Sequence, residues 1–113
     1  MKNVFTIFTG DAKTLSLKAL YADSLNPLDL TTCTEIDIAL PLAGGGFRHL
    51  LLTEEEVSVT SPAVLGKFSA PISDEDSLLL KVGELQSFDV TFTIGAEILS
   101  VKYANSLSVF EGT

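Results

Sequence analysis

Apolar and polar residues alternate along most of this chain, which is the period of a β-strand and not that of a helix. The clearest case is segment 88–94, where every second residue is apolar and the rest are polar. Its residues are β-branched or aromatic throughout the apolar positions, as strands favour. We therefore expect Phe88, Val90, Phe92 and Ile94 to share a face that is turned toward the core.

The same alternation predicts several further strands that are separated by turns. Their ranges are 4–8, 13–21, 34–40, 47–52, 57–60, 67–72, 97–103 and 107–110. Turns are expected at 23–27, where Asp, Asn and Pro favour a reversal, and at 44–46, which is Gly-Gly-Gly. Gly95-Ala96 has the form of a two-residue type II′ hairpin loop, with Gly first.

Helix is predicted only near residues 73–81. Ser73 is a favourable N-cap, and the acids at 74–76 would lie where the helix dipole favours negative charge. Lys81 and Gly83 predict the end of this helix. This segment is about two turns long, so we interpret it as a connector.

Together these elements predict an all-β protein. Eight or nine strands spaced 8–12 residues apart, with almost no helix, are typical of an antiparallel β-sandwich. The chain has 113 residues, which fits one domain over 1–113 and leaves no room for a second core. A βαβ arrangement would need crossover helices that the pattern does not contain.

Composition narrows the classes of partner. The chain is 46% hydrophobic and 19% charged, which argues against disorder, and its formal charge is −8. Such a charge opposes binding to nucleic acid and to anionic membrane surfaces. No segment is apolar enough to span a bilayer or to act as a signal peptide, so we expect synthesis in a reducing cytoplasm, consistent with the unpaired Cys33.

Candidate chemistry is sparse in this sequence. The single His49 could serve as a general base, but we favour an exposed strand residue, and we interpret Cys33 as a small buried hydrophobe. The acidic runs 54–56 and 74–76 lack the spacing of a calcium loop, and no helix or Lys-Ser pair follows 44–46 as phosphate binding requires. We therefore predict no catalytic residue, no cofactor and no metal site.

One stretch of the chain resembles a known family. Thr9-Gly10-Asp11 precedes the strand at 13–21, and Asn26-Pro27-Leu28-Asp29-Leu30-Thr31 precedes the alternating segment 35–38. This order resembles the small immunoglobulin-like β-sandwich domains of tailed-phage baseplate and tail proteins, such as the N-terminal domains of baseplate upper proteins. The closest likeness covers about residues 9–41, with weaker echoes at 66–68, 73–80 and 107–110.

The residues of this motif also have a structural interpretation of their own. Asn26-Pro27 would form the turn, Leu28 and Leu30 would plug the end of the sandwich, and Asp29 and Thr31 would cap backbone amides. Members of the family often continue into a helical or receptor-binding extension, whereas this chain stops at Thr113. The resemblance thus implies an attachment module alone or a small free-standing virion protein, without catalytic residues.

The function expected from the resemblance is that of a phage or prophage virion structural protein in the tail, baseplate or head–tail connector. It would be made in the host bacterial cytoplasm, would not be secreted by a signal peptide, and would dock to other virion proteins or to copies of itself. The alternative is a carbohydrate-binding β-sandwich module. Sugar platforms usually expose Trp or Tyr, and this chain has no Trp and only Tyr21 and Tyr103.

The candidate protein interface is the segment 47–52, with Phe47, Arg48 and Leu51 as its proposed contact residues. Three consecutive leucines interrupt the alternation there, so at least one should point away from the core. The segment also lacks the Lys and Pro residues that commonly protect an exposed edge. The alternative is a central strand buried on both faces, or a Leu covered by the chain's own loops.

Overall fold

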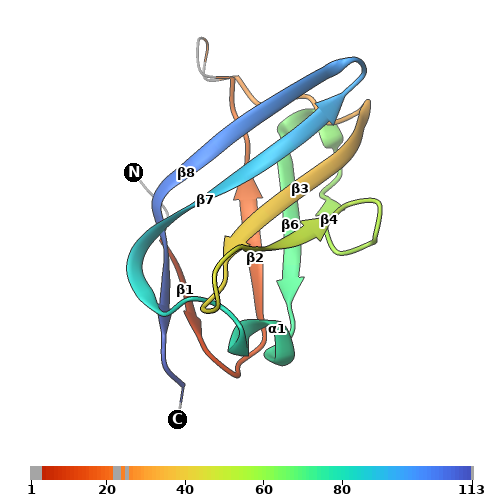
Figure 1. Cartoon of the computed structure of the whole chain (residues 1–113). Helices are drawn as coiled ribbons and strands as arrows, with labels where there is room; N and C mark the ends of the chain where they lie inside the picture. The colour runs from red at the N-terminus through yellow and green to blue at the C-terminus, as the bar shows by residue number, and fades with distance from the viewer. Residues whose placement is uncertain (1–3, 22–23, 25, 113) are drawn as a thin grey trace.

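The computed structural model describes residues 4–21, 24 and 26–112, and these are mostly in strands (Figure 1). The eight strands are β1 (Phe5–Phe8), β2 (Lys13–Lys18), β3 (Cys33–Pro41), β4 (Phe47–Leu51), β5 (Ser58–Val59), β6 (Lys67–Ile72), β7 (Gly83–Ile94) and β8 (Glu97–Phe110). A short α-helix, α1 (Asp74–Leu78), and a single 3-10 turn, η1 (Ala63–Leu65), complete the elements. The prediction of an all-β protein with about eight strands is confirmed at this level.

The strands form two sheets. The larger has the order β1-β8-β7-β3-β4, and the smaller has the order β2-β6-β5 (Figure 1). All pairs are antiparallel except β1 with β8, which run parallel from Phe5 opposite Leu107 to Phe8 opposite Phe110. The expectation of a wholly antiparallel arrangement was therefore wrong at β1. The alternation of apolar and polar residues indicates which face of a strand is buried, but it carries no information on the direction of the neighbouring strand.

Side chains from both sheets meet in one hydrophobic core. Phe68 of β6 and Phe92 of β7 pack edge to face across it, with ring centroids 5.4 Å apart. Phe88, Val90 and Phe92 are buried as predicted, and Ile94 packs against the core from a partly buried position. The periodic pattern of β7 thus places its core face correctly.

The final two predicted strands are one. Segments 97–103 and 107–110 belong to the single strand β8, which pairs with β7 through two register shifts. Leu85 (φ 52°) and Asn105 (φ 54°) have left-handed backbone near these shifts. A bulge inserts extra residues into a strand without ending it. The prediction of two strands was therefore wrong, because the polar residues between 103 and 107 lie within one continuous strand.

The turns predicted at 44–46 and at Gly95-Ala96 are confirmed. The 44–46 tip joins β3 to β4 as a hairpin, with Pro41 opposite Phe47. Gly95 has φ +60°, as the first position of a type II′ turn requires, and Ile94 lies opposite Glu97. The 23–27 turn falls partly outside the described residues.

The motif that carries the family resemblance has part of the structural role expected for it, since Asp29 caps a backbone amide whereas the Thr31 hydroxyl bonds to the Asp29 carboxylate. Leu28 and Leu30 are buried in the core. Between them the exposed Asp29 carboxylate accepts a hydrogen bond from the backbone N–H of Thr31 at 2.9 Å. A hydrogen bond from the Thr31 hydroxyl, followed by this contact with the backbone N–H, lowers the pKa of Asp29.

The predicted helix exists but is shorter than the 73–81 segment. Ser73 is its N-cap and accepts from the N–H of Asp76 at 3.1 Å. The helix ends at Leu78 because Leu80 is drawn into the core, where it bridges to Leu42. The 3-10 turn η1 was not predicted.

Ser77 joins α1 to the loop between β1 and β2. Its hydroxyl is fully buried, accepts from the N–H of Gly10 at 2.9 Å, and donates to the C=O of Asp74 at 2.9 Å.

Replacing Ser77 by Ala leaves the Gly10 amide without this acceptor, and we expect the free energy of unfolding to fall by about 1–3 kcal/mol. Denaturant unfolding measures this. An equal effect of the exposed Ser58→Ala would show that the buried hydroxyl is unimportant.

Candidate docking surfaces

β4 forms one outer edge of the five-stranded sheet, so it is not a central strand. Leu50 is buried, and since successive strand residues point to opposite faces, Leu51 lies on the outer face of the sheet. Leu51 and Leu52 are both partly exposed, and Leu52 packs against the core. Phe47, which shares the parity of Leu51, is 55% exposed.

Arg48 lies on the opposite face from Phe47 and Leu51. Its guanidinium contacts the carboxylate of Glu56 at 2.5 Å and that of Asp76 at 3.4 Å. The hydrogen bond with Glu56, followed by the contacts with Asp76, raises the pKa of Arg48 further above its ordinary value. Of the three predicted contact residues, Phe47 and Leu51 therefore point outward, whereas Arg48 is held in ion pairs within the chain.

Part of the β4 edge is also capped by the chain itself. Glu56 accepts from the N–H of Leu51 at 3.2 Å through its carboxylate, and its own N–H donates to the C=O of Leu51 at 3.0 Å. The Arg48 side chain donates to the C=O of His49 at 2.5 Å. These contacts protect the edge that appeared bare from its lack of Lys and Pro.

The residues considered for chemistry are dispersed. His49 is exposed, and its Nδ1 lies 2.8 Å from a carboxylate oxygen of Asp37 on the outer face of the sheet. Cys33 is partly buried against the core, and burial raises the pKa of its thiol. Over residues 4–21, 24 and 26–112, no three His, Cys, Asp or Glu side chains gather as a metal site would require. No helix in this part of the chain is long and apolar enough to cross a membrane.

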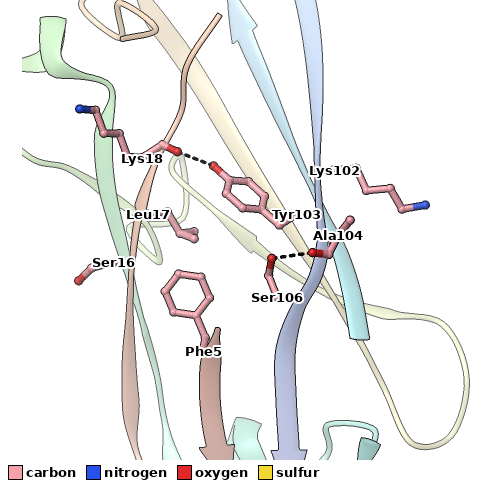
Figure 2. Close-up of a pocket in the computed structure, with 8 residues that line it drawn as sticks. All are labelled: Phe5, Ser16, Leu17, Lys18, Lys102, Tyr103, Ala104 and Ser106. Atoms are coloured by element: carbon pink, nitrogen blue, oxygen red, sulfur yellow. Dashed lines mark hydrogen bonds between the residues drawn. The ribbon is translucent and has the colours of Figure 1, made fainter. Parts of the chain in front are cut away.

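A cavity that the sequence did not reveal opens between β2 and β8 (Figure 2). Its volume is about 330 Å³. Phe5, Leu17 and Tyr103 supply its apolar lining, and Lys18 and Lys102 lie on either side of it (Figure 2). The Tyr103 hydroxyl crosses the gap and donates to the C=O of Lys18 at 3.1 Å.

A second cavity of about 380 Å³ lies nearer the start of β8, between β8 and residues of the segment that follows β2. Leu28, Leu99 and Val101 supply much of its apolar lining, and it shares Lys102 with the first cavity. We call the two cavities together the β2–β8 seam. The seam exists because the four-residue β1 pairs with β8 only over 107–110. No sequence pattern within either segment predicts this pairing.

Tyr103 is the bridge between the two sides of the seam. Its ring stacks on Phe88, with centroids 5.1 Å apart, and burial raises its pKa to about 12. Because this pKa lies above the value of about 10 of an unfolded chain, the neutral phenol stabilises the fold at neutral pH. That contribution is present below pH 10 and is lost as the pH rises from about 10 to about 12.

We expect Tyr103→Phe to remove this alkaline loss of stability. At neutral pH the same change should lower the free energy of unfolding by about 1 kcal/mol, since it deletes the bond to Lys18. Denaturant unfolding across the pH range, with tyrosinate absorbance of the folded chain, measures both effects. Identical alkaline titrations of the wild type and the variant would contradict the assignment.

No protein-family model matches the chain, and no curated protein matches it significantly.

Proposed function

We propose that this chain is a non-enzymatic virion structural protein of a phage or prophage, an immunoglobulin-like β-sandwich that docks to neighbouring proteins in the tail, baseplate or head–tail connector. The observation that carries the docking role is the pair of incompletely covered edges on the larger sheet. One edge is β4, where Glu56 already caps Leu51 and Arg48 caps the C=O of His49, and the other is β8 where it extends beyond β1. Exposed edges offer backbone groups to an incoming strand.

The strand order supports the immunoglobulin-like interpretation. Immunoglobulin sandwiches have a sheet with strands B, E and D adjacent and a second sheet with G, F, C and, in variable domains, C′. Here β2-β6-β5 correspond to B, E and D, and β8-β7-β3-β4 correspond to G, F, C and C′. The departure is β1, which pairs with β8 and not with β2. As a result, the outer edge of β2 is not covered by β1.

The outward residues of β4 fit the docking proposal. Phe47 is more than half exposed at the edge, and Leu51 shares its face. We retain these two as proposed contact residues. Arg48, engaged by Glu56 and Asp76, is proposed to hold the edge in position.

The geometry of the tyrosines favours docking over carbohydrate binding. Tyr103 stacks one face on Phe88 and uses its hydroxyl for Lys18, so that ring is already occupied within the chain. Tyr21 is exposed, but a sugar platform usually needs more than one aromatic face.

The genes on either side of the coding gene test the proposal at low cost. A virion role predicts tail, portal or tape-measure genes beside it. Neighbouring genes for polysaccharide-degrading enzymes, with no virion genes, would contradict it and favour the carbohydrate-binding alternative.

A further inference from the structure

We propose that the β2–β8 seam receives an extended segment of a partner protein, with apolar side chains at alternate positions and carboxylates between them. This inference rests on the proposed docking function and specifies the chemistry of the partner. The segment would pair with β8 by strand addition, in which the main chain provides hydrogen bonds and alternate side chains enter pockets.

The backbone of β8 is available for such pairing. Its partner on one side is β7, while β1 covers only Leu107–Phe110 on the other. The two-residue turn makes Ile94 and Glu97 a hydrogen-bonded pair, and antiparallel pairs alternate from there. The N–H and C=O groups of Ile98, Ser100 and Lys102 therefore point away from β7, toward the incoming strand.

The seam presents two apolar pockets in succession along this edge. Leu17 and Tyr103 line the first cavity, and Leu99 and Val101 line the second. Residues two apart on a strand lie on the same face, about 7 Å from each other. An inserted strand can therefore direct two of its alternate side chains into the two cavities.

The charge around the seam specifies an acidic partner. Lys18 and Lys102 flank the first cavity, with their ammonium groups directed away from it on opposite sides (Figure 2). Lys102 lies directly opposite Asp89 on β7, but the ion-pair contacts found in the described part of the chain involve only Arg48 and His49 as cations. Lys18 also lies directly opposite Lys67 on β6, an arrangement of like charges that is unfavourable. A carboxylate from a partner would relieve this repulsion.

A second copy of the chain is a less suitable occupant than an acidic segment. If two copies joined through their β8 edges, each would bring the same Lys102 to the joint. The β4 edge, the other candidate, is capped at Leu51 by Glu56. These features favour a different protein.

The test begins with selection of nine-residue peptides from a random display library against the immobilised full chain. We expect the enriched peptides to alternate apolar residues with Asp or Glu. One enriched peptide, labelled with a fluorophore, is then titrated with the wild type and with variants whose melting temperatures match it.

Ser100→Pro should weaken binding of the labelled peptide by at least about 30-fold, because proline removes the outward N–H and is tolerated at a strand edge. Ser100→Ala, which keeps that N–H, should weaken binding far less than Ser100→Pro. Lys18→Glu and Lys102→Glu should each weaken binding by about tenfold at low salt. Lys81→Glu makes the same change of charge outside the seam and should alter the affinity by less than about twofold.

Three results of the peptide experiments would overturn the inference. They are failure to enrich any peptide, enrichment of basic peptides, and equal binding by Ser100→Pro and the wild type. A dimer of the chain alone that Ser100→Pro dissociates would assign the seam to a second copy, and would also overturn it. The identity of the genes that flank the coding gene does not depend on peptide binding. A failure of this inference can therefore be distinguished from a failure of the proposed function.

Discussion

Phe92→Ala is expected to lower the free energy of unfolding by about 3–5 kcal/mol, the range for deleting a buried aromatic ring. Phe92 is fully buried at the centre of β7 and packs edge to face on Phe68 from the other sheet. Removing it leaves a cavity where the two sheets meet and takes away an aromatic pair. Denaturant unfolding with a matched wild-type control measures the loss.

Thr91→Ala is the control for this prediction. Thr91 is the neighbour of Phe92 on β7 but points to the outer face, where its hydroxyl approaches that of Ser100 at 3.4 Å. Its replacement should cost less than about 1 kcal/mol. If Thr91→Ala proved as costly as Phe92→Ala, the assignment of inner and outer faces would be wrong by one residue.

Gly66→Ala should destabilise the fold by about 3–5 kcal/mol, because two separate penalties combine. Gly66 has φ +69°, a left-handed conformation that is unfavourable for alanine. A Cβ atom there would also lie 2.6 Å from the C=O oxygen of Ala19 and 2.9 Å from that of Leu28. Both contacts are with backbone, which cannot rotate away as a side chain can.

Gly44→Ala provides the matched control for Gly66→Ala. No atom lies within 4 Å of a Cβ placed at Gly44, in the β3–β4 hairpin tip. We expect a change within about 0.5 kcal/mol there, measured by thermal or denaturant unfolding. Comparable stabilities of the two variants would contradict the close packing of the chain around Gly66.

Features set by neighbouring residues were predictable from the sequence. The alternation in β7 identified Phe88, Val90 and Phe92 as core residues because a strand's period is local. The hairpin at Gly95 and the N-cap at Ser73 were predictable for the same reason. Each depends on a few consecutive residues.

Features set by tertiary pairing were not predictable in this way. The parallel pairing of β1 with β8 joins segments from the two ends of the chain. The contacts of Arg48 with Glu56 and Asp76 span 8 and 28 residues. Neither appears as a pattern within one segment.

The candidate site was only partly predictable. Phe47 and Leu51 could be identified because consecutive leucines interrupt the alternation of an apparent strand, and both are at least partly exposed. The β2–β8 seam could not, since it depends on how little of β8 the short β1 covers. Lys18 and Lys102 become neighbours of one cavity only once the two sheets are in place.

Association with phage particles tests most directly whether this chain is a docking protein of a virion, as we propose. Phage particles are produced from a host that carries the coding gene, purified through a density gradient and analysed by quantitative mass spectrometry. If the chain docks in the virion, we expect it to co-sediment with the particles in a fixed ratio to their tail proteins. Recovery of the chain only in the particle-free supernatant of the lysate would contradict it.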